Sequence, residues 1–201
     1  MADRNETVNT IAQEALEDEK KLEKLVEALA VSARRERQVS ASALHVIAKA
    51  NPEKLVQYID ALVDALNRPE AQTRWEALET LAILVDLDAR ACGKALVGAE
   101  TSLFDEESGP ARLAAMRFFC KYGATTALRS EKVWPLIDEG IQCYHGDLEF
   151  NDMLTALIDF SNGKLADDVV AAFKDRMAFD ATNGKGTLKK RAQQIIGNLE
   201  K

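Results

Sequence analysis

The sequence predicts an all-α protein made of two-helix repeats, and two observations carry this prediction. A six-residue pattern occurs five times, at residues 43–48, 77–82, 115–120, 156–161 and, in a weaker form, 192–197. It has small residues at both ends, an apolar residue at the second position and a large apolar residue at the fifth, while the third and fourth positions vary. Successive copies begin roughly 34 to 41 residues apart, a typical period for two-helix repeats. The composition agrees, because Ala, Leu, Glu and Lys are abundant while Gly and Pro number only 10 and 4, and this mixture favours helices over strands.

The first element expected is an N-terminal helix before residue 18, where Val8, Ile11 and Leu16 are apolar. It is expected to cap one end of the stack, since terminal repeats need a polar outer face.

Each repeat is then expected to open with a first helix that has its own signature. Residues 25–29 match residues 62–66 almost residue for residue. Apolar residues in these segments recur at i, i+3, i+4 and i+7, the spacing of a helix with one buried face. Looser copies of the signature follow at residues 96–99, 136–139 and 169–173.

The six-residue pattern marks the second helix of each repeat. Its small residues are expected to let neighbouring helices approach, and its large residues to fill the space between layers. The small residues are Ala43, Ala48, Ala77, Ala82, Ala115, Cys120, Ser161 and Gly197. The large residues are Ile47, Leu81, Phe119, Phe160 and Ile196. Because one hairpin cannot bury both of its faces, the hairpins must stack, and a final helix over 187–199 closes the array.

Prolines and glycines give the expected helix ends. Pro135 is expected near the start of a helix, while Gly123 and Gly163 are expected to stop helices. Three further prolines are expected to open helices, where a missing amide hydrogen costs little: Pro52, Pro69 and Pro110.

A basic residue three positions before the leading alanine points to a family. Arg74, Arg112 and Lys189 occupy this position in three copies, and Asp105 lies just before Arg112. The pattern resembles the HEAT repeat, in which an acidic residue after the first helix and an arginine opening the second form a ladder between units. The resemblance covers about residues 18 to 200. It implies a right-handed α-α superhelix of about five hairpins with an N-terminal capping helix, a single domain over 1–201, and a scaffold or adaptor role without a specific partner.

Charge and composition limit the partners and the cellular setting. Acidic residues outnumber basic ones by 33 to 26, for a net charge of −7, which disfavours a duplex nucleic-acid binder and slightly favours a basic partner. The sequence shows no signal-peptide pattern, no apolar run long enough for a membrane, and three separated cysteines without a disulfide pattern. A cytoplasmic protein with reduced thiols and no membrane contact is therefore expected.

No catalytic residue, cofactor or metal site is predicted. The 184–187 loop resembles a phosphate loop but lacks the upstream glycine and the preceding strand, so an ordinary loop is preferred. Cys143 and His145 have no common metal-ligand spacing and are interpreted as a helix end and its loop. Cys120 is interpreted as a small core residue.

Trp75 raises one enzymatic alternative. HEAT-like DNA alkylation-repair glycosylases use aromatic and acidic residues in a basic cleft, and Trp75 with Glu76 or Glu79 could imitate such a pair. The acidic chain disfavours this, and a tryptophan packed where successive repeats meet is preferred.

The best candidate surface lies on the second helices, which line the concave face of HEAT-like stacks. Their residues outside the core form a ridge of mixed charge, which suits a protein or peptide better than a phosphate backbone. The sequence therefore predicts a non-enzymatic protein–protein interaction scaffold or adaptor; the alternative is a HEAT-like nucleic-acid-binding or DNA alkylation-repair protein. Ala114 is among the ridge positions, and the contact candidates are His45, Lys49, Glu79, Arg117 and Lys121.

Overall fold

The computed structural model describes residues 2–31 and 33–201. Side chains are described for residues 6–31 and 33–201. Within these ranges every regular element is helical and none is a strand. The chain divides into two compact units, Met1–Ala115 and Met116–Lys201, and each is described by itself. No helix in the described ranges combines the length and the apolar character needed to cross a bilayer.

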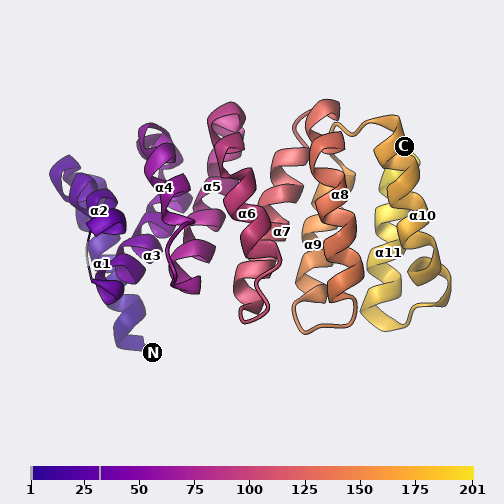
Figure 1. The fold of residues 1–201 in the computed structure, drawn as a ribbon, viewed down its shortest axis with the longest axis horizontal. Coiled ribbons are helices and arrows are strands. Elements are labelled where there is room, and N and C mark those ends of the chain that lie inside the picture. Colours follow the sequence, from indigo (N-terminus) through magenta and orange to yellow (C-terminus); the bar gives the residue numbers. More distant parts are fainter. Residues whose placement is uncertain (1, 32) are drawn as a thin grey trace. The chain divides into compact units, whose positions relative to one another are not determined.

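In the first unit, equivalent helices of successive repeats pack on one another. Helix α2 packs against α4, and α3 packs against α5 (Figure 1), as the stacking of hairpins requires. Helix α7 begins in this unit and ends in the second. The elements are α1 (Ala2–Glu17), α2 (Glu19–Val31), α3 (Arg34–Ala50), the 3-10 helix η1 (Pro52–Tyr58), α4 (Ile59–Ala65), α5 (Ala71–Cys92), the 3-10 helix η2 (Gly93–Ala95), α6 (Leu96–Leu103) and α7 (Gly109–Gly123).

The second unit repeats the same arrangement. Helix α8 packs against α10, and α9 packs against α11. A backbone hydrogen bond of 2.8 Å from Lys164 N to the Ala124 carbonyl joins the turns of successive hairpins. The elements after α7 are α8 (Ala127–Tyr144), α9 (Phe150–Ser161), α10 (Asp167–Asn183) and α11 (Gly186–Leu199).

These helices follow the predicted order, with α1 as the N-terminal helix. One boundary has no loop: Asp88, with φ −146° and ψ 77°, kinks α5 between a second helix and the next first helix. The Asp88 carboxylate accepts a 2.9 Å hydrogen bond from Ala91 N and so caps the segment after the kink. The five hairpins are α2–α3, η1/α4–α5, the end of α5 with η2/α6–α7, α8–α9 and α10–α11.

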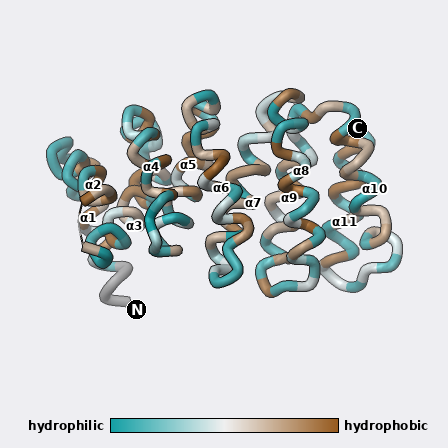
Figure 2. Tube along the Cα trace, in the orientation of Figure 1, coloured by the Kyte–Doolittle hydropathy of each residue, from teal (hydrophilic) through white to brown (hydrophobic). Residues whose placement is uncertain are grey.

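The core confirms most of the packing roles. The leading alanines Ala43, Ala77 and Ala115 are fully buried, and apolar and polar residues alternate along the helices (Figure 2), as one-sided burial requires. The large residues of the first four copies are also fully buried: Ile47, Leu81, Phe119 and Phe160.

For the last copy of the six-residue pattern, the predicted core position is wrong by one residue. Ile195 is fully buried, whereas Ile196 is half-buried, so the core face of α11 follows Ala192, Ile195 and Leu199. Gly197 is exposed, and a Cβ added there would meet nothing within 4 Å. This glycine is therefore not needed for close helix approach. The six-residue alignment fails here because a closing helix needs only one buried stripe.

Most of the helix ends are confirmed, and one is wrong. Pro52 is the first residue of η1, and Gly123 is the last of α7. Pro135 lies inside α8, not near its start. The helix begins earlier because Thr126 caps it, accepting a 3.2 Å hydrogen bond from Arg129 N on its hydroxyl. Proline removes one helical amide donor, and the packing of α8 on α10 stabilises the helix around it.

Candidate functional site

Two arginine–carboxylate pairs join successive repeats in the first unit. Arg37 on α3 donates from Nε (3.2 Å) and Nη2 to the carboxylate of Glu70, which precedes α5. One repeat later, Arg74 on α5 donates from Nη2 to Asp105, which precedes α7. Only 5% of the Glu70 side chain and 15% of the Asp105 side chain are exposed. The ladder expected from the HEAT resemblance is therefore present in this unit.

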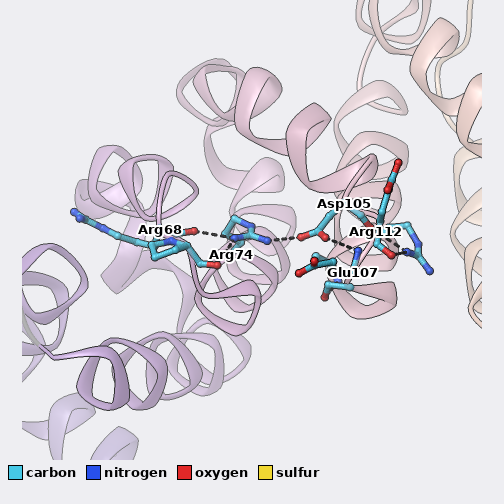
Figure 3. Close-up of polar contacts among 9 residues, drawn as sticks. Arg68, Arg74, Asp105, Glu107 and Arg112 are labelled. Carbon is cyan, nitrogen blue, oxygen red and sulfur yellow. Dashed lines mark hydrogen bonds and ion pairs between the residues drawn. The ribbon is translucent and has the colours of Figure 1, made fainter.

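Arg74 and Arg112 also bind the backbone of the turns between helices. Arg74 Nη1 donates to the carbonyls of Arg68 (2.9 Å) and Pro69 (2.8 Å). Arg112 Nη1 donates to the carbonyls of Asp105 (2.9 Å) and Glu106 (3.2 Å). The contacts run from Arg68 through Arg74 and Asp105 to Arg112 (Figure 3). Each arginine thus fixes the turn before its own helix, and Arg74 also binds the following turn.

The Arg37–Glu70 pair keeps the carboxylate charged. The hydrogen bond from Arg37 lowers the pKa of Glu70 below its ordinary value of 4.5, although burial opposes the shift. Arg34 adds a smaller electrostatic contribution in the same direction.

A cavity of about 470 Å³ lies beside this ladder. Its walls come from the starts of α3 and α5 and from the segment before α7. Trp75 contributes an aromatic side chain to the lining. The lining residues are Arg34, Pro69, Glu70, Ala71, Arg74, Trp75, Asp105, Glu107 and Ser108.

Side chains of α3 and α5 also form a polar strip along the predicted ridge. Ser42 Oγ donates to Glu76 Oε1 at 2.8 Å, and His45 Nδ1 lies 2.7 Å from Glu76 Oε2. Gln72 Nε2 donates to Ser42 Oγ at 3.1 Å. Burial would raise the pKa of Glu76, but the hydrogen bonds from His45 and Ser42 lower it overall. Four side chains from the second helices of two successive repeats thus form one network.

The predicted contact residues fall in both units. His45 and Glu79 are half-buried and Lys49 is exposed in the first unit, while in the second Arg117 is half-buried and Lys121 is exposed. The structure brings His45 to Glu76, which was a ridge position but not a chosen contact.

The prediction that Ala114 lies on the exposed ridge is wrong. Ala114 is 1% exposed, so it belongs to the core. A small apolar residue beside the leading alanine of α7 can turn inward without strain on the packing.

The two tryptophans have different surroundings. Trp75 is half-buried at the junction of repeats, where the preferred interpretation placed it, but it also lines the cavity. In the second unit, the Trp134 ring lies 6.4 Å from Phe160 and 5.0 Å from Phe173, centroid to centroid. Trp134 is therefore part of an aromatic core.

The segments examined for metal or phosphate chemistry have structural partners. Helix α8 ends at Tyr144, and His145 Nε2 lies 3.1 Å from both carboxylate oxygens of Asp180. Within the described residues, no three His, Cys, Asp or Glu side chains gather in a group that could hold a metal ion. The 184–187 loop leads into α11, where Lys189 Nζ donates to the Thr182 carbonyl at 2.8 Å.

Sequence reasoning missed the first rung of the ladder and the cavity. The first copy has Ser40 at the position of Arg74, so the basic-residue rule passed over Arg37. A search for an arginine and an acid about one repeat apart would have found both pairs, because the partners are separated by 33 residues in Arg37–Glu70 and by 31 in Arg74–Asp105.

Comparison with known proteins identifies the fold. No protein-family model matches the sequence, and no curated protein matches it. A designed armadillo repeat protein in complex with the peptide (KR)4 is similar with a TM-score of 0.75 and 16% identity, over 96% of this chain and 90% of that one.

Two further solved structures agree. An engineered protein from a structural genomics consortium has a TM-score of 0.73 and 20% identity, over 97% of this chain and 91% of that one. A computationally designed armadillo repeat protein for modular peptide recognition has a TM-score of 0.69 and 14% identity, over 96% and 92%. The chain therefore has the all-α helical-repeat solenoid fold of the HEAT and armadillo type.

Proposed function

We propose that this protein is a non-enzymatic interaction scaffold, in the cytoplasm, which binds a protein or peptide along the face of its second helices. The proposed contacts are His45, Lys49 and Glu79 in the first unit, and Arg117 and Lys121 in the second. The helical-repeat fold suits such a role, because stacked second helices present equivalent positions at regular intervals.

The observation that carries the proposal is the polar strip on α3 and α5. Ser42, His45 and Glu76 are fixed by mutual hydrogen bonds of 2.7–2.8 Å, so this part of the surface is ordered before any partner arrives. A preorganised surface loses less side-chain entropy on binding than a loose one. The designed relative in complex with (KR)4 supports a peptide as the kind of partner.

The test is partner capture with charge-reversed variants of exposed residues. Lys49→Glu in the first unit and Lys121→Glu in the second are each expected to weaken retention of a stoichiometric protein from native lysate. Lys24→Glu on α2 and Lys132→Glu on α8 are matched controls, since both lysines are exposed on first helices. Equal retention by all four variants would refute the ridge as the binding surface.

The competing function is nucleic-acid binding, including base excision by a Trp–Glu pair. It predicts salt-dependent affinity for DNA. Against it, Glu76 already accepts hydrogen bonds from Ser42 and His45. A DNA titration at low salt decides between the two: saturable binding would favour the competitor.

A further inference from the structure

The cavity beside the ladder contains charges that differ in how far they are already neutralised. Arg74 donates to Asp105 and to two carbonyls. Glu70 is bound by Arg37, and Arg34, exposed at the start of α3, adds to the positive field around it. A ligand carboxylate would therefore be repelled by Glu70 and Asp105, and Arg34 is the lining cation left to attract it.

Glu107 is the contrasting group. It lines the cavity, its side chain is exposed, and it lies beside the Arg74–Asp105 pair (Figure 3). The backbone N–H of Glu107 donates to Asp105 Oδ1 at 2.9 Å, which fixes the position of its backbone. The carboxylate of Glu107 forms no ion pair with any described residue, so it is available to a cation from outside.

Trp75 completes the site from another wall. Trp75 lines the cavity and is half-buried, so part of its indole ring can contact a ligand there. A guanidinium that stacks on an indole gains a cation–π interaction, and tryptophan is the best aromatic partner for it. A planar cation can also make a bidentate contact with a carboxylate.

The distribution of charge over the chain favours the same ligand. All of the acidic excess, net −7 from 33 acidic and 26 basic residues, lies in the first unit, because the second unit contains equal numbers of each. A basic segment is therefore drawn toward the unit that contains the cavity.

We propose that this cavity is an anchoring site for an arginine side chain of a partner peptide, with the guanidinium on Trp75 and its charge paired with Glu107. This inference rests on the proposed interaction function and specifies the chemistry of the partner. Arg34 opposes the bound cation and limits its affinity. The volume of about 470 Å³ is within the usual range of ligand pockets, and the cavity is open to solvent on one side.

The test is calorimetric titration of the full chain with a tetra-arginine peptide that has blocked ends. Tetra-citrulline, which has the same shape without the charge, and tetra-glutamate are the comparison probes. Tetra-arginine is expected to bind about tenfold or more tightly than either. Glu107→Gln and Trp75→Leu are each expected to weaken tetra-arginine binding about five- to tenfold, and Arg34→Gln to strengthen it.

Glu53→Gln is the matched control, because Glu53 is an exposed acid of the first unit outside the cavity. It is expected to change the affinity less than about twofold, as a screened surface charge should. If Glu53→Gln and Glu107→Gln weaken binding equally, a diffuse field explains the affinity and the site is refuted. Tighter binding of tetra-glutamate, or no binding of tetra-arginine, also overturns it. Trp75→Leu counts only with an unchanged unfolding curve, while Glu107→Gln leaves the core untouched.

Failure here is distinct from failure of the proposed function. Capture that depends on Lys49 or Lys121 without tetra-arginine binding removes the arginine site and leaves the scaffold. Tetra-arginine binding that depends on Glu107, with capture insensitive to the ridge variants, keeps the site and refutes the ridge.

Discussion

Arg74 is the side chain whose removal should cost the first unit most among the polar groups. Its guanidinium makes three hydrogen bonds, to the carbonyls of Arg68 and Pro69 and to the carboxylate of Asp105. Only 14% of the Arg74 side chain is exposed. In Arg74→Ala all three bonds are lost. The Asp105 carboxylate then loses the guanidinium that pairs with it, although only 15% of the Asp105 side chain is exposed to solvent.

The magnitude follows from these contacts. Breaking a fully buried ion pair costs about 3–5 kcal/mol, and a surface pair about 0–1 kcal/mol. The two carbonyl bonds to a charged donor add to this, but the partial exposure of both side chains reduces it, so we expect a loss of about 3 kcal/mol. Arg74→Lys keeps the charge but lacks the planar fork, and should lose about half as much.

The assay is urea unfolding followed by tryptophan fluorescence. Each unit contains one tryptophan, Trp75 or Trp134, so a Trp134→Phe background reports the first unit alone. A loss of 3 kcal/mol corresponds to a midpoint shift of about 1–2 M urea for a unit of this size. Arg90→Ala is the control, since Arg90 is exposed on the same helix. If Arg74→Ala unfolds within about 0.5 kcal/mol of the Arg90→Ala protein, the ladder does not stabilise the unit and the reasoning is wrong.

Three further predictions concern acid, glycine and cysteine. The pKa of Glu76 in the folded protein is below 4.5. The stabilisation by its carboxylate is therefore present above about pH 4.5 and is lost as pH falls through the folded pKa. Urea unfolding near pH 7 and near pH 3.5 should show the difference in stability between wild type and Glu76→Gln becoming smaller in acid. Gly163→Ala should destabilise the second unit, since its Cβ would lie 2.6 Å from Ala124 Cα, whereas Gly197→Ala should stabilise it by about 0.5–1 kcal/mol; opposite midpoint shifts in Trp134 fluorescence check both. A thiol reagent should label only Cys143 rapidly in the native protein, because it is exposed while burial raises the pKa of the other two thiols, that of Cys92 to about 12; fast labelling that survives in Cys143→Ser would contradict this.

The repeat pattern predicted the fold because burial and helical spacing leave a strong periodic signal. Ala43, Ile47 and Phe119 had to face the core wherever hairpins stack, and they do. The pattern failed where that constraint weakens. In α11 only one face packs, so the choice between Ile195 and Ile196 could not be read from an alignment with helices that pack on two sides.

The candidate site was less accessible to sequence reasoning. The ladder was expected from Arg74 and Arg112, but the pairing of Arg37 with Glu70 depends on an arginine one turn away from the repeated position. The cavity depends on how the starts of α3 and α5 approach the segment before α7, which is a matter of three-dimensional arrangement. Trp75 was singled out for its residue type, yet nothing in the pattern indicated that it would line the same cavity as Glu107.

The kink at Asp88 affects how the repeats of this protein can be exchanged. Without a loop there, a second helix runs through one bent segment into the first helix of the next hairpin. The Arg74–Asp105 pair spans this junction, so its two halves lie on opposite sides of the bend. A graft cut at Asp88 would separate the arginine from its carboxylate, whereas a graft cut directly after Glu70 would carry Arg74 and Asp105 together and would also leave Arg37 with Glu70. Recombination or design that treats each hairpin as an independent cassette should therefore place its seams in the turns within hairpins.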